Sequence, residues 1–146
     1  MNVTMTHRSF QLVLGAAVVA WTGAAFAVCL NGNPSLEQEY QTSTTVFVGR
    51  VASEEFTPES KNHLDGTTYS VHVEEVLRGS PDKLVKLFSE NTSGRFPMQV
   101  GAAYLVFVHE ESDQLEVDNC GNSGKLPEKT EALEALRNMK QREPNK

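Results

Sequence analysis

The stretch of sequence that decides the fold is TTVFVGRVASEEF, residues 44–56. β-Branched and aromatic residues fill its first half, and these residue types are enriched in strands because they pack well on a pleated surface. Side chains alternate between the two faces of a strand, so Phe47 and Val51 lie on one face. Val46 and Val48 lie on the other face. We therefore predict a strand with apolar side chains on both faces.

A glycine stands inside this predicted strand. Gly49 does not end the apolar run, because apolar residues continue past it. An interior glycine of this kind is typical of a bulge or of a sharp coil of the sheet, and not of a turn. A strongly coiled first strand suits a small closed or nearly closed barrel.

Turn-rich segments divide the rest of the chain into further elements. Four more strands are predicted at residues 67–79, 83–90, 102–111 and 114–120, after a short helix that begins at Leu36 and before a helix at 128–142. Ser35 or Asn33 can cap the short helix, and Glu37 and Glu39 suit its first turn. The run at 102–111 is almost continuously apolar, so we expect this strand to be buried on both sides. The predicted fold is mainly β.

The first 27 residues have the pattern of a signal peptide. Arg8 precedes an apolar run that ends in Ala25-Phe26-Ala27, a small-x-small cleavage pattern. The run is about 16 residues long, shorter than the ~20 that a spanning helix needs. We predict that residues 1–27 are removed after Ala27, so that the protein is periplasmic or extracellular with no stable membrane anchor.

The charge of the chain argues against one class of partner. Removal of Arg8 with the leader takes the formal net charge from −6 to −7. Nucleic-acid affinity comes largely from Lys and Arg side chains that release counterions from phosphates. No basic stripe offsets the acidic balance, so we expect no nucleic-acid binding.

The stretch AFAVCLNGNP, residues 25–34, raises the question of what Cys29 does. A lipid anchor would require a small residue before the cysteine, but bulky Val28 stands there. A reactive or metal-seeking tip at the N-terminus is a second possibility. The third is a disulfide with Cys120, the other of the two cysteines, which an oxidising compartment favours. The chain has no C-x-x-C motif for thioredoxin-like redox catalysis.

The sequence offers no arrangement typical of an enzyme. His63, His72 and His109 have no Cys, His or Asp partner at a metal-ligand spacing, and we interpret them as solvated side chains. Neighbouring acids such as Glu54-Glu55 point to opposite faces of a strand, so they form no local catalytic pair and instead protect a sheet edge. We predict no catalytic residue, no metal and no cofactor. Asn91 begins a glycosylation motif, Asn91-Thr92-Ser93, relevant in a secretory pathway that glycosylates.

Four blocks together resemble a known family. They are VFVGRV (46–51), YSVHVEEVLRG (69–79), AYLVFV (103–108) and LEVDNCGNSGKL (115–126). In this order, after Cys29 and an early helix, they resemble the netrin-like domain family, which includes the tissue inhibitors of metalloproteinases, and particularly its small bacterial exported members.

The resemblance implies a fold and its boundaries. Residues 28–126 would form a five-stranded OB-fold-like Greek-key barrel, and residues 127–146 a C-terminal helix with a frayed tail. It also implies that a cysteine of the N-terminal segment is bonded to one late in the barrel, which matches Cys29 and Cys120.

The resemblance also implies a site. In the inhibitors, the first cysteine of the mature chain chelates the zinc of the protease, and adjacent residues enter its substrate cleft. The matching edge here is Val28, Cys29, Leu30 and Asn31. Predicted cleavage leaves Val28 ahead of Cys29, so the free amine would not lie on the cysteine.

Two main functions follow as hypotheses. The first is a non-enzymatic, exported protein-binding module whose target is unknown. The alternative is a zinc metalloprotease inhibitor that acts through the Cys29 edge. Less favoured are a thiol enzyme that uses Cys29 or Cys120, and an envelope carbohydrate-binding protein. Phe56 and Phe96 are the loop aromatics that such a carbohydrate site could use, although core packing or simple exposure explains them more readily.

Overall fold

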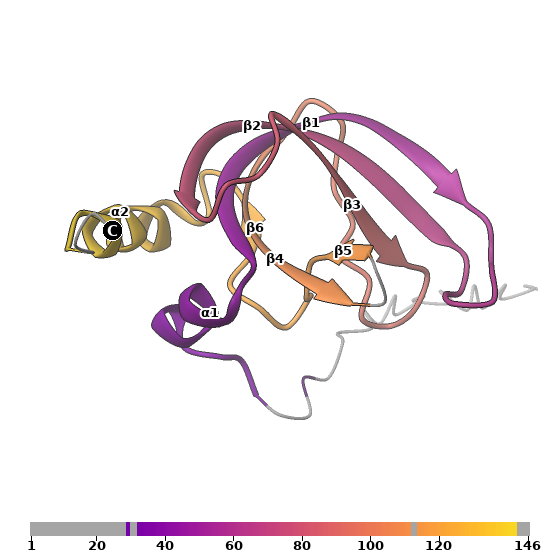
Figure 1. Ribbon diagram of the computed structural model, residues 1–146, viewed down its shortest axis with the longest axis horizontal. Helices are drawn as coiled ribbons and strands as arrows, with labels where there is room; N and C mark the ends of the chain where they lie inside the picture. The colour runs from indigo at the N-terminus through magenta and orange to yellow at the C-terminus, as the bar shows by residue number, and fades with distance from the viewer. Residues whose placement is uncertain (1–28, 30–31, 112–113, 143–146) are drawn as a thin grey trace, which may run out of the picture.

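The computed structural model describes residue 29, residues 32–111 and residues 114–142 (Figure 1). The predicted signal peptide, 1–27, lies outside the described residues, as do Val28, Leu30 and Asn31 of the predicted edge. Within the described ranges, no helix is both long and apolar enough to cross a membrane. The described chain is mainly β.

The elements follow one another in an order close to the predicted one. They are α1 (Leu36–Thr42), β1 (Thr45–Thr57), β2 (Gly66–Arg78), β3 (Leu84–Glu90), β4 (Ala103–Glu111), β5 (Gln114–Glu116), β6 (Gly124–Lys125) and α2 (Thr130–Arg142). Ser35 caps α1, since its side chain accepts a hydrogen bond from the backbone N–H of Gln38.

Five of the strands form a ring of pairings. The sheet has the order β1-β2-β3-β5-β4-β6, and β1 also pairs with β4, which closes the ring (Figure 1). All pairings are antiparallel except that of β3 with β5, where Phe88 lies opposite Glu116. The prediction of five strands is therefore confirmed as a ring of five, with a sixth short strand beside it.

β1 has the predicted irregularity at Gly49. Its register with β2 shifts at three places, one of them between Val48 and Gly49. A Cβ atom at position 49 would lie 2.7 Å from Cγ1 of Val71 and 2.9 Å from the carbonyl oxygen of His72. Glycine therefore allows β1 to bend closely over β2 while its other edge pairs with β4.

The two faces of β1 belong to two hydrophobic clusters, as the alternation predicts. Phe47 and Val51 lie in a cluster that fills the ring, with Tyr69 and Val71 of β2. Val46 and Val48 belong to a second cluster outside the ring, which α1 and α2 cover through residues Tyr40, Leu133 and Leu136. β4 is buried from Tyr104 to Val108, because its side chains enter both clusters in turn.

The predicted fifth strand is wrong in its length. β5 ends at Glu116 and does not continue to Cys120. The side chain of Asp118 accepts a hydrogen bond from the backbone N–H of Cys120, and its carbonyl accepts one from Gly121, so the chain turns here instead of extending. Beyond this turn, β6 pairs with β4 and was not predicted, because two residues carry no readable alternation.

Candidate functional site

A disulfide joins Cys29 to Cys120, as predicted. It connects the first described residue to the turn after β5, over a sequence separation of 91 residues and a Cα–Cα distance of 5.7 Å. Both cysteines are half-buried and lie outside the strands. A disulfide indicates a non-reducing environment.

A buried carboxylate is also bonded to the turn that contains Cys120. Glu39 of α1 is only 2% exposed. It accepts hydrogen bonds from the backbone N–H of Asn122 at 2.6 Å and from Nδ2 of Asn122 at 2.7 Å. Nδ2 of Asn122 also donates to the carbonyl of Pro34 at 3.1 Å. The turn after Cys120 is thus bonded both to α1 and to the segment that leads into it.

Two further residues complete this arrangement. Nε2 of His109, at the end of β4, lies 3.6 Å from Oε1 of Glu39. The interpretation of His109 as simply solvated is therefore wrong, since one side of its ring faces a buried acid. A Cβ atom at Gly121 would collide with the Glu39 carboxylate, so a side chain there would displace Glu39 from its position. We call Glu39, His109, Gly121 and Asn122 the Glu39 clamp.

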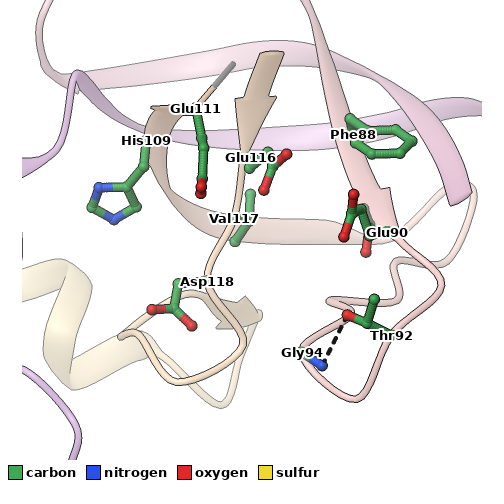
Figure 2. A pocket seen from close by; sticks show the side chains of 10 residues that line it. Phe88, Glu90, Thr92, Gly94, His109, Glu111, Glu116, Val117 and Asp118 are labelled. Atoms are coloured by element: carbon green, nitrogen blue, oxygen red, sulfur yellow. Dashed lines mark hydrogen bonds between the residues drawn. The ribbon is translucent and has the colours of Figure 1, made fainter. Parts of the chain in front are cut away.

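Beside the clamp lies an acidic cavity of about 350 Å³. Its carboxylates come from Glu90, Glu111, Glu116 and Asp118, and His109 also lines it. Figure 2 shows Glu90 on one side of the opening and Glu111 and Glu116 on the other. Within the described ranges, no group of three side chains is arranged to hold a metal ion.

The acidic surroundings affect one of these carboxylates in particular. Burial raises the pKa of Glu116, and the nearby charges of Glu111 and Glu90 raise this pKa further, while His63 opposes the effect. Like charges at close range disfavour the ionised form of each other. The cavity is therefore a place where negative charge is concentrated.

Of the other residues singled out from the sequence, His63 lies beside the cavity, because its ring centroid is 4.9 Å from that of Phe88, which lines the cavity. Nδ1 of His63 lies 2.8 Å from the carbonyl oxygen of Leu64, and His72 is exposed on β2. Phe96 is buried in the ring, so it is a core residue, whereas Phe56 is 67% exposed. Asn91 is exposed, and its Nδ2 donates to Asp65.

Glu39 and Asn122 were not recognised as site residues. Glu39 follows a capping residue, as many solvated helix acids do. Its partner Asn122 is 83 residues away along the chain, so no local pattern predicts the contact. Asn122 stands in a glycine-rich loop, where asparagine is common for conformational reasons. Neither signal separates a structural anchor from a surface residue.

No family model matches the chain, and the search of curated proteins found no match.

Proposed function

We propose that this chain is an exported, non-enzymatic protein-binding module of the netrin-like OB-fold type. The ring of five strands, the short helix before it and the helix after it support this proposal. The disulfide from the N-terminal segment to a late turn supports it further, because the family has a bond of this kind. In this proposal the ring is a small barrel that serves as a rigid support.

The anchoring of the N-terminal segment carries the proposal. Cys29 is covalently bonded to the turn, and Asn122 joins the same turn to Pro34 and to α1. A segment held at both ends loses little entropy when a partner binds it, so more of the contact energy appears as affinity. The edge Val28–Asn31 spans the first of these anchors and is therefore the proposed contact surface.

A photo-crosslinking amino acid at Leu30 tests this role in the exported protein. We expect one discrete envelope protein to be captured, and an excess of the unlabelled protein to compete for it. The same probe at exposed Glu128, outside the edge, is the matched control. Equal capture at both positions, or none at Leu30, would contradict the proposal.

Inhibition of a zinc metalloprotease is the alternative use of the same edge. In this mechanism the free amine and carbonyl of the first residue chelate zinc, so the position of the mature N-terminus decides the outcome. Intact mass under non-reducing conditions reports the cleavage site and the disulfide together. A mature chain that begins at Val28 and has no effect on a panel of zinc metalloproteases would exclude this alternative.

Two other functions receive less support. A thiol enzyme would need a free thiol, and both cysteines are joined in the disulfide. Labelling of the native protein with a thiol reagent tests this point, because a disulfide does not react. A carbohydrate site would need exposed aromatic rings, and of the two aromatics considered only Phe56 is exposed.

A further inference from the structure

One part of β1 lies outside the ring of pairings. The pairing of β1 with β4 ends at Arg50, and the last backbone bonds on that side join Val51 to Gly101 and Ala102. β1 nevertheless continues to Thr57, paired with β2. Among the described residues, β2 is the only strand that pairs with Ser53–Thr57. Figure 1 shows this half of β1 at the outer margin of the molecule, with β2 between it and β3.

A hollow adjoins this free edge. A cavity of about 210 Å³ lies beneath the end of the β1–β2 hairpin, and its lining includes Phe56, Tyr69 and Pro97. Phe56 pairs with Thr67, and Tyr69, two residues further along β2, points into the ring. Phe56 therefore lies on the inner face of the hairpin, at the margin of the cavity nearest to the free edge. It is the most exposed of the large apolar side chains described.

The charges around the edge are mainly negative. Glu54 and Glu55 are exposed on the free half of β1. Asp65 and Glu90 line the cavity, and their hydrogen-bond donors, Asn91 and Leu64, are neutral. Arg95 is the basic residue in the lining. A second copy of this edge would bring Glu54 and Glu55 against like charges, so self-pairing is disfavoured.

We propose that the outer edge of β1 at Ser53–Thr57 is a strand-addition site for an extended peptide segment that carries Lys or Arg. Backbone hydrogen bonds to the free edge supply affinity, and alternate side chains enter the neighbouring hollow. A basic side chain there lies against the face of Phe56 and near Asp65 and Glu90, which favours it by cation–π attraction and by charge. The same acids that prevent self-pairing select a basic partner. This site is independent of the Val28–Asn31 edge.

A model peptide tests the proposal on the full exported protein. The probe is acetyl-Lys-Val-Lys-Val-Lys-Val-amide, and two matched peptides serve as controls. In one, glutamate replaces each lysine; in the other, alternate backbone nitrogens are methylated, which prevents strand pairing. We expect the lysine peptide to bind and to slow amide hydrogen exchange within Ser53–Thr57. Each control peptide should bind at least about tenfold more weakly.

Two double variants distinguish this site from general attraction to an acidic protein. Glu54→Lys/Glu55→Lys should weaken binding of the lysine peptide at least about tenfold. Glu131→Lys/Glu134→Lys makes the same change of charge at exposed positions of α2, and should weaken binding less than about threefold.

The proposal is wrong if the lysine peptide does not bind at millimolar concentration. It is equally wrong if the methylated peptide binds as well, or if protection from exchange appears at the acidic cavity instead of β1. Failure of the Leu30 crosslinking experiment would leave this result unaffected, since the two surfaces involve different residues.

Discussion

Glu39 shows how a single buried carboxylate can join parts of the chain that are far apart in sequence. Its Oε2 atom accepts two hydrogen bonds from Asn122, and its helix precedes the first strand. Hydrogen bonds to a charged acceptor are stronger than those between neutral groups, and a donor left without its acceptor adds a penalty. The position of the Cys120 turn therefore depends on this residue as well as on the disulfide.

Replacement of Glu39 by alanine should lower the free energy of unfolding by about 2 kcal/mol, because Asn122 loses its acceptor. Urea denaturation of the oxidised protein measures the change. The control is Glu37→Ala on the exposed face of the same helix, where we expect a change below about 0.5 kcal/mol. Equal effects of the two substitutions would show that the clamp contributes nothing to stability.

The raised pKa of Glu116 leads to a prediction about how the stability of the fold depends on pH. This pKa is raised in the folded protein above the ordinary value of 4.5, so the folded state binds the proton more tightly than the unfolded state. The ionised side chain therefore destabilises the fold above the raised pKa, and this penalty disappears as the pH falls below 4.5.

Glu116→Gln should accordingly increase the free energy of unfolding at pH 7 and have little effect at pH 3. Denaturation curves at the two pH values test the sign. Glu128→Gln, at an exposed position, measures the general effect of removing one negative charge. A stabilisation by Glu116→Gln that is the same at both pH values would argue against the raised pKa as its cause.

At the scale of elements, β1 depends on its interior glycine. Position 49 has no room for a Cβ atom between Val71 and the backbone of His72. Overpacking of this kind typically costs 1–3 kcal/mol. Even a methyl group at this position should therefore disturb the bend of β1 and the closure of the ring.

Gly49→Ala should lower the free energy of unfolding by about 2 kcal/mol. Gly94→Ala is the matched control, because the nearest atom to its added Cβ would be 3.7 Å away. We expect the control to change stability by less than about 0.5 kcal/mol. Thermal denaturation of both variants measures the difference, and an unchanged midpoint for Gly49→Ala would show that β1 accommodates the methyl group elsewhere.

The elements differ in how well the sequence predicts them. β1 and β4 were predicted because burial on both faces leaves a long, nearly continuous apolar pattern. β5 was predicted too long because Val117 is apolar and its neighbours are compatible with a strand, although Asp118 begins a turn. β6 is only two residues long, and its existence depends on the position of β4.

At the scale of the whole molecule, the disulfide and the ring make separate contributions. The ring is closed by the pairings of β1 with β2 and β4, whereas the disulfide ties a terminal segment to a turn. A bond that closes so long a loop restricts mainly the unfolded chain. We therefore expect loss of the disulfide to lower the free energy of unfolding but to have less effect on the arrangement of the strands.

The double variant Cys29→Ser/Cys120→Ser should lose about 4 kcal/mol of unfolding free energy relative to the oxidised protein. At 25 °C and without denaturant, its circular dichroism should still show the strand signal if the ring is sufficient for folding. Denaturation with urea gives the loss of stability. A variant that is already unfolded without urea would show that the ring cannot form without the covalent bond.

The chain as a whole was easier to predict than its site. The β class, the two flanking helices and the cysteine pair follow from alternation, spacing and the small number of cysteines. The Glu39 clamp depends on contacts between α1, β4 and the Cys120 turn. The acidic cavity depends on the meeting of β3, β4 and β5, which only the closed ring brings together. Local patterns carry no signal for such contacts.

The disulfide has one more consequence, for a chain exposed to proteases. The exposed loop between β1 and β2 lies inside the covalent circle that Cys29 and Cys120 close. A single backbone cut at residues 58–62 would therefore leave two fragments that remain joined through sulfur. The nicked protein would migrate as one species until a reductant separates it into two. Cleavage in this loop would therefore leave the strands on both sides of the cut in one covalent molecule.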